Sequence, residues 1–106
     1  GSEGMLQPAD MIEGQEDVNI IFNSRTAVGS HGIAVLMDSM RRFAAHESLQ
    51  AMGCWSMVNI ALVPEQKAAL VKLGGISVAA DAMAHHPKNA EVQFRALFAL
   101  INLVIP

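Results

Sequence analysis

Glu47–Leu62, ESLQAMGCWSMVNIAL, is the most informative segment of this 106-residue chain. Its apolar residues recur at the three- and four-residue spacing of a helix. Most of the segment returns 43 residues later as Glu91–Ile105, EVQFRALFALINLVI. Two copies of one helix at a fixed offset predict a repeat protein.

The repeat extends beyond these two helices. An ungapped overlay of residues 32–63 on residues 75–106 compares 32 positions, of which seven are identical and eleven more exchange one apolar residue for another. The identical pairs are Gly32/Gly75, Ile33/Ile76, Val35/Val78, Asp38/Asp81, Met40/Met83, Gln50/Gln93 and Asn59/Asn102. The apolar register is kept throughout, so the two segments are expected to fold alike.

Helical spacing interrupted by glycine and proline predicts an all-α chain. Pro64 and Pro87 each end a helix, and Gly29–Gly32 and Gly74–Gly75 are expected turns. The expected helices are 17–28, 33–45, 47–62, 65–73, 76–86 and 90–104. No apolar run approaches the ~18 residues of a membrane span, and no secretory signal opens the chain.

Residues 1–15 are expected to contribute little to the fold. Gly1–Ser2 are typical of a cloning scar. In the weakly patterned segment 3–15, a short helix from Pro8 to Gly14 and disorder both remain open.

The order of short helix, Gly-Gly turn, medium helix and long helix resembles the armadillo repeat family, to which importin-α and β-catenin belong. The matching motifs are Leu-Gly-Gly-Ile at 73–76, Asn-Ala-Glu-Val-Gln at 89–93 and Leu-Phe-Ala-Leu-Ile-Asn-Leu at 97–103. The resemblance implies a right-handed α-solenoid fragment of two units, 16–63 and 64–106. The first joint departs from the family pattern, with Ser30-His31-Gly32 in place of Gly-Gly. Two units are also fewer than the three that a solenoid needs.

In armadillo proteins the third helix of each unit lines a concave groove. The resemblance therefore implies that Trp55, Asn59, Phe98 and Asn102 face a peptide, together with Met52 and Arg95 one turn before the aromatic rings. An Asn amide can pair with a peptide backbone of any sequence, and aromatic rings hold long side chains. A core position remains open for Trp55, Phe98 and Met52, whereas a core Asn would need internal partners.

Importin-α binds basic peptides with an array similar to Trp55-Ser-Met-Val-Asn59. Arg95 falls on the same face one turn from Phe98, and its positive charge argues against a basic ligand here.

The charge of the chain also argues against nucleic-acid binding, because a nucleic-acid site needs clustered Lys and Arg. The net charge of this chain is −3 and its seven basic residues are scattered, so no nucleic-acid partner is expected.

No motif for metal, cofactor or catalysis is found. The four histidines, His31, His46, His85 and His86, lack the spacing of zinc ligands and are expected at helix ends. Cys54 is the one cysteine and has no nearby histidine to activate it. Gly74-Gly75 lacks the Lys-Ser/Thr of a phosphate loop. We therefore expect no enzyme activity.

These observations predict a non-enzymatic interaction module that binds an extended peptide or a partner helix in its groove. The alternative is a structural spacer or self-association segment whose groove is unused, in which case Asn59 and Asn102 would be bonded internally. The lone Cys54 indicates a reducing, intracellular and cytoplasmic location, with nuclear shuttling allowed. The last helix has apolar residues on more than one face, so a two-fold homodimer is expected.

Overall fold

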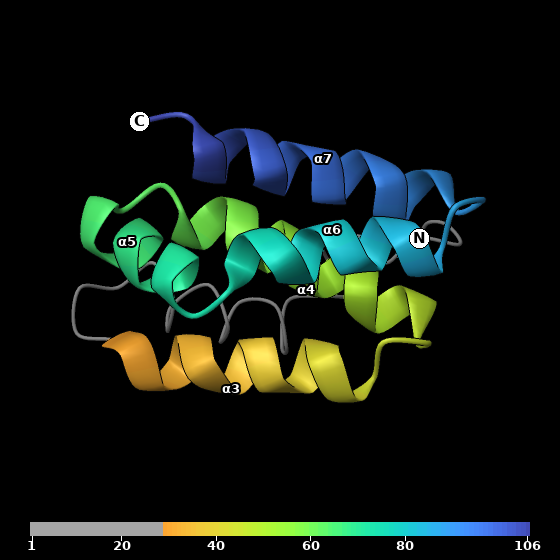
Figure 1. Cartoon of the computed structure of the whole chain (residues 1–106), viewed down its shortest axis with the longest axis horizontal. Helices are drawn as coiled ribbons and strands as arrows, with labels where there is room; N and C mark the ends of the chain where they lie inside the picture. Colours follow the sequence, from red (N-terminus) through yellow and green to blue (C-terminus); the bar gives the residue numbers. More distant parts are fainter. Residues whose placement is uncertain (1–28) are drawn as a thin grey trace, which may run out of the picture.

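The computed structural model describes residues 29–106, which form five helices with no strand among them (Figure 1). The helices are α3 (Gly29–Arg42), α4 (Glu47–Ile60), α5 (Pro64–Lys72), α6 (Gly75–His85) and α7 (Ala90–Val104). The predicted all-α class is confirmed over these residues. Residues 1–28, which hold the expected segment 1–15 and the expected helix 17–28, lie outside the described residues.

The predicted turn at Gly29–Gly32 is wrong, because α3 already begins at Gly29 and these residues form its first turn. A glycine costs a helix only about 1 kcal/mol relative to alanine. Ile33, Met37 and Met40 bury one face of the same helix, and this burial outweighs that cost. The end of this helix was predicted at residue 45, and α3 ends at Arg42. The predicted helices 47–62, 65–73 and 76–86 start and end within two residues of the observed bounds, and α7 starts and ends as predicted.

The two halves of the repeat pack differently, because α3 contacts α5 more than it contacts α4, whereas α6 packs mainly against α7. In Figure 1, α6 lies between α3 and α7, and α4 lies behind it. The two long helices α4 and α7 contact each other along their length, and α6 packs beside α7. None of the helices in residues 29–106 has the length and hydropathy needed to cross a membrane.

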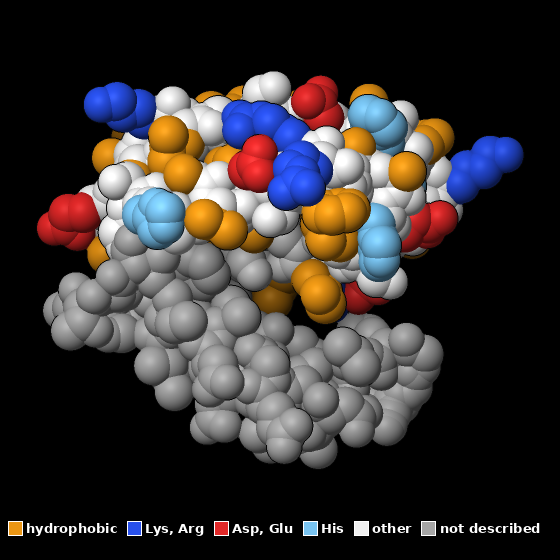
Figure 2. All heavy atoms as spheres, turned by 90° about the horizontal axis from the view of Figure 1, so that it is seen from below, with side chains coloured by type: hydrophobic (Ala, Val, Ile, Leu, Met, Phe, Trp, Pro, Cys, Tyr) orange, Lys and Arg blue, Asp and Glu red, His pale blue; other side chains and the backbone are white. Residues whose placement is uncertain are grey.

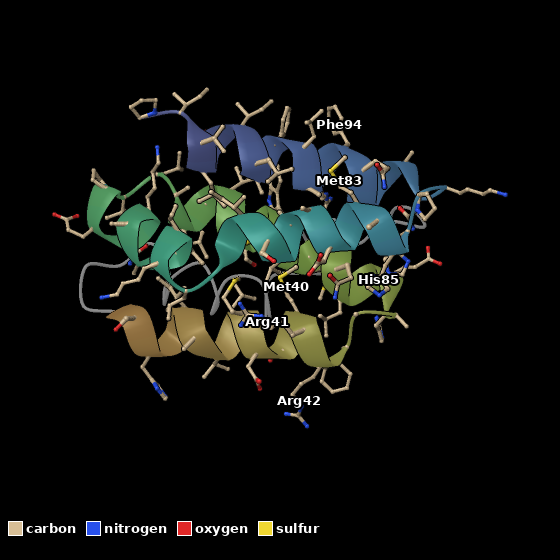
Figure 3. The ribbon with its side chains drawn as sticks, viewed as in Figure 1. Met40, Arg41, Arg42, Met83, His85 and Phe94 are labelled. Carbon is tan, nitrogen blue, oxygen red and sulfur yellow. The ribbon has the colours of Figure 1, made fainter. Side chains whose placement is uncertain are left out.

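The core is built from one stripe of each helix. On α7 the stripe is Val92, Ala96, Ala99 and Leu103, whose small members allow close helix packing. On α4, a Cβ at position 53 would collide with the side chain of Met40. The glycine there therefore leaves room for Met40 to pack against α4. Figure 3 shows Met40 and Met83 projecting into the interior from α3 and α6. Of the other methionines, Met37 and Met57 are buried as well.

Gly74 forms the corner between α5 and α6. Its φ of +97° lies in the left-handed region that favours glycine. A side chain there would also strike the guanidinium group of Arg41, whose Nη2 donates a 2.9 Å hydrogen bond to the carbonyl of Leu73. The positive φ therefore favours glycine at this corner, and a larger residue would also have to displace the Arg41 side chain.

The two connections that lead into the long helices are built alike. The side chain of His46 accepts a hydrogen bond from the backbone N–H of Leu49, and Asn89 does the same for Val92. Asn89 also donates to the carboxylate of Glu47, which ties the second connection to the start of α4. Capping by these side chains satisfies backbone N–H groups that the first turn of a helix leaves free.

Candidate functional site

The residues predicted to form the groove lie on two adjacent helices. Met52, Trp55 and Asn59 come from α4, and Arg95, Phe98 and Asn102 occupy the same three positions of α7. We call this set the α4–α7 surface. Trp55 is 36% exposed and Phe98 is 38% exposed, while Met52 is exposed and both asparagines are half-buried. The rings therefore lie at the surface of the protein rather than in its core.

Arg95 connects the two helices. Its guanidinium carbon lies 5.4 Å from the centroid of the Trp55 ring, within the range of a cation–π contact. The same group forms a 2.7 Å ion pair with Glu91, one turn earlier on α7. Arg95 therefore already has both an anion and an aromatic ring as neighbours.

The two asparagines make the same bond on their own helices. Nδ2 of Asn59 donates to the carbonyl of Trp55 at 3.3 Å, and Nδ2 of Asn102 donates to that of Phe98 at 2.9 Å. Each bond uses one of the two N–H donors of the amide. Within residues 29–106, the second N–H and the Oδ1 acceptor of each side chain form no further hydrogen bond.

Phe94 was missed by the sequence analysis. It is 60% exposed, and its ring centroid lies 4.6 Å from that of Phe98. Figure 3 shows Phe94 pointing away from the body of the molecule. The i, i+4 spacing of the two phenylalanines was the available signal, since residues at that spacing are neighbours on a helix.

The structure brings together only part of the predicted set. Trp55 and Arg95 meet across the two helices, whereas the Phe98 ring contacts the Phe94 ring of its own helix at a tilt of 43°. Within residues 29–106, no hydrogen bond joins Asn59 to Asn102. The α4–α7 surface therefore offers aromatic rings, amide groups and one paired cation.

Cys54 lies beneath this surface and is fully buried. Burial raises the pKa of the Cys54 thiol to about 12, and the nearby positive charge of Arg95 only partly opposes that shift. The thiolate is the nucleophilic form of cysteine. At neutral pH this side chain therefore acts as a small apolar residue.

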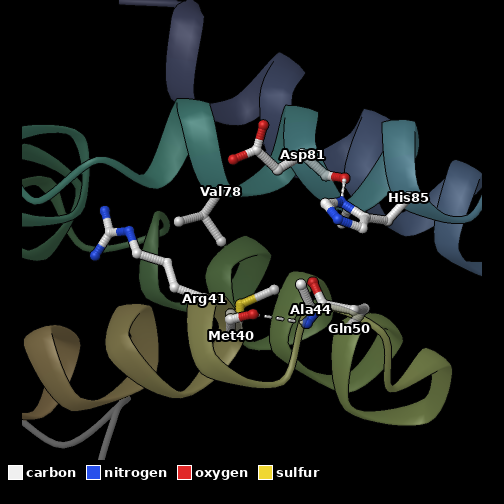
Figure 4. A pocket seen from close by; sticks show the side chains of 8 residues that line it. Met40, Arg41, Ala44, Gln50, Val78, Asp81 and His85 are labelled. Carbon is white, nitrogen blue, oxygen red and sulfur yellow. Dashed lines mark hydrogen bonds between the residues drawn. The ribbon is translucent and has the colours of Figure 1, made fainter.

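A separate pocket of about 270 Å³ lies between α3, α4 and α6, and Figure 4 shows the side chains that line it. Two of the polar side chains that line it form hydrogen bonds with backbone carbonyls. Nε2 of Gln50 donates to the carbonyl of Met40, and the ring Nδ1 of His85 lies 3.0 Å from the backbone oxygen of Asp81. The described residues contain no group of three or more His, Cys, Asp or Glu side chains that could hold a metal ion.

The charges on the described surface are mixed. On the face seen in Figure 2, Lys and Arg side chains lie beside acidic and hydrophobic ones, without a continuous basic patch on the described part of that face. Among the described residues, Arg42 forms an exposed ion pair with Asp38 at 3.7 Å. Comparison of the chain with family models, with curated proteins and with solved structures finds no match.

Proposed function

We propose that this chain is a non-enzymatic protein–protein interaction module of the armadillo repeat type, a right-handed α-solenoid fragment that binds an extended peptide on its α4–α7 surface. The repeated helix pairs support the repeat assignment. Binding is supported by Trp55 and Phe98, which are partly exposed at equivalent positions. Each is followed one turn later by an asparagine whose side chain makes a single hydrogen bond within residues 29–106.

The amide groups suit a peptide backbone. An extended strand offers alternating N–H and C=O groups, and an Asn side chain can accept from one and donate to the next. The rings on either side would hold the side chains of the peptide. Because each asparagine is already fixed by a bond to its own helix, little rotamer entropy is lost when it binds.

The positive charge of Arg95 determines which peptide side chains this surface prefers. A ligand Lys or Arg that stacked on Trp55 would have to displace Arg95 from the ring and would meet its positive charge. Neutral or apolar peptide side chains avoid this cost. The proposed ligand is therefore an extended peptide without a basic cluster, unlike the cargo that the Trp-x-x-x-Asn resemblance implies.

The experiment is a selection of random linear peptides by the folded chain, followed by titration of the selected peptides. Trp55 is the only tryptophan, so its fluorescence reports directly on the surface. We expect the selected peptides to change this fluorescence saturably and to carry few Lys or Arg residues. Peptides that bind without perturbing Trp55 would place the ligand elsewhere.

A second candidate is a structural spacer whose α4–α7 surface binds nothing. One observation favours it, namely that Nδ2 of both Asn59 and Asn102 already bonds a carbonyl of its own helix. Under this alternative, the selection yields no peptide that binds the folded protein saturably and is displaced by an excess of the same peptide.

A further inference from the structure

Among residues 29–106, three histidine side chains form hydrogen bonds with the backbone, and they do so in two chemically different ways. The rings of His85 and His86 lie beside carbonyl oxygens, that of Asp81 at 3.0 Å and that of Ala44 at 2.7 Å. A carbonyl oxygen can only accept, so each of these rings donates an N–H. A ring nitrogen that donates keeps its hydrogen when the imidazole becomes charged, and both bonds therefore survive protonation.

His46 is bonded in the opposite sense. It is the N-cap of α4, and its Nδ1 lies 3.1 Å from the backbone nitrogen of Leu49. A backbone N–H can only donate, so Nδ1 must accept, which it can do only while it carries no hydrogen. Protonation of the ring puts a hydrogen on both nitrogens and removes this bond. Asn89 caps α7 at the same position with an amide oxygen, which does not titrate.

The helix dipole also acts on these side chains with opposite signs. His46 stands at the N-terminus of α4, where a positive charge is unfavourable. His85 and His86 stand at the C-terminus of α6, where a positive charge is favourable. Charging His46 is therefore the one protonation of the three that both breaks a bond and opposes the dipole of its helix.

The charged groups around the start of α4 do not offset this cost. Glu47 follows His46 in the chain and would attract a charged ring, but its carboxylate already accepts a hydrogen bond from Asn89 of the next connection. The other titratable groups that line a surface pocket with Glu47 are neutral or positive, namely His85, His86 and Lys88. Arg42, in the last turn of α3, is positive as well.

We propose that His46 makes the start of α4 sensitive to pH in the range in which imidazole titrates, about pH 5 to 8, whereas Asn89 keeps the start of α7 insensitive. The neutral ring stabilises the fold, so the cap is present at the upper end of this range and is lost as the pH falls. Gln50 still ties the first turn of α4 to the carbonyls of Met40 and Phe43, so the protein stays folded when the cap opens. The effect does not depend on peptide binding by the α4–α7 surface.

The test is chemical denaturation of the wild type and of His46→Asn at pH 7.5 and at pH 5.5. Asparagine is a good N-cap at both pH values, so the variant keeps the cap and lacks only the group that titrates. Complete loss of a cap changes the unfolding equilibrium constant about fivefold. We expect this constant for the wild type, relative to His46→Asn, to rise by about three- to fivefold on going to pH 5.5. An equal change in the two proteins would overturn the proposal.

His85→Asn is the matched control, because His85 donates in both charge states and its removal should leave the loss of stability at low pH in place. A loss that disappears in this variant but persists in His46→Asn would overturn the assignment to His46.

Nuclear magnetic resonance adds a local measurement. The amide signal of Leu49 should shift as the ring of His46 titrates, while that of Val92, which is capped by Asn89, should not follow it. A Leu49 signal that stays constant while the ring titrates would contradict the cap itself.

Discussion

Gln50 and Gln93, which are 43 residues apart, make the same two hydrogen bonds in the two halves of the molecule. Nε2 of Gln50 donates to the carbonyls of Met40 and Phe43, both at 3.0 Å. Nε2 of Gln93 donates to those of Met83 and His86, both at 2.9 Å. The last carbonyls of a helix have no partner within it. Each long helix therefore satisfies the end of the helix before it with a single glutamine.

Gln50→Met should destabilise the protein by about 1–3 kcal/mol, because it leaves two carbonyls without their donor inside the protein. Gln50 is only 2% exposed and its bond to the Met40 carbonyl is buried, so water is a poor replacement for that bond. Chemical denaturation measures the free energy of unfolding. Gln66→Met is the control, since the Oε1 of Gln66 is buried without a hydrogen-bond partner among the described residues. That variant should be neutral or more stable, and equal losses in the two variants would contradict this role for Gln50.

Gly74→Ala should cost more than the roughly 1 kcal/mol that a positive φ imposes on alanine. The additional cost comes from the new Cβ, which meets the guanidinium group of Arg41. A double-mutant cycle with Arg41→Ala separates the two contributions. In the Arg41→Ala background, Gly74→Ala should lower the free energy of unfolding only by the contribution of the positive φ. Strictly additive effects would show that Arg41 can move aside at no cost.

Cys54 should resist thiol reagents at pH 8 in the folded protein and react once the protein is unfolded. Its pKa is raised from 9.0 to about 12 by burial. A raised pKa in the folded state means that the protonated thiol stabilises the fold below pH 9, and this contribution falls as the pH rises toward 12. The wild type should therefore lose stability faster than Cys54→Ala between pH 9 and 12. Parallel stability curves for the two proteins would contradict the raised pKa.

Much of the fold could be predicted from the sequence, because strong helix patterns were separated by proline or glycine. Pro64 and Pro87 mark helix boundaries whatever the tertiary structure is, since proline cannot continue the hydrogen-bond ladder. The start of α3 was predicted at residue 33, four residues after its observed start at Gly29, because glycine only weakens a helix and burial of Ile33 and Met37 decided the outcome.

The site was harder to predict than the fold. Which residues share a helix face follows from spacing, so Trp55 and Asn59 could be paired from sequence alone. The contact of Arg95 with Trp55 joins two helices, and its geometry depends on how α4 and α7 pack. The overlay of the two repeats shows that Gln50 and Gln93 are equivalent positions. Their hydrogen bonds could not be predicted, because the accepting carbonyls come within reach only when the turn between the two helices is folded.

The most direct test of peptide binding is the dissociation constant of a selected peptide, measured by the fluorescence of Trp55, for three single-residue variants. Asn59→Ala and Asn102→Ala should each weaken binding by about 1–3 kcal/mol, or roughly 5- to 150-fold, with helix content unchanged. Ser56→Ala is the matched control, because Ser56 makes the same kind of bond to the carbonyl of Met52 but is not part of the α4–α7 surface. It should bind as the wild type does. If Asn59→Ala unfolds the protein while affinity per folded molecule is unchanged, Asn59 is structural and the α4–α7 surface does not bind peptide.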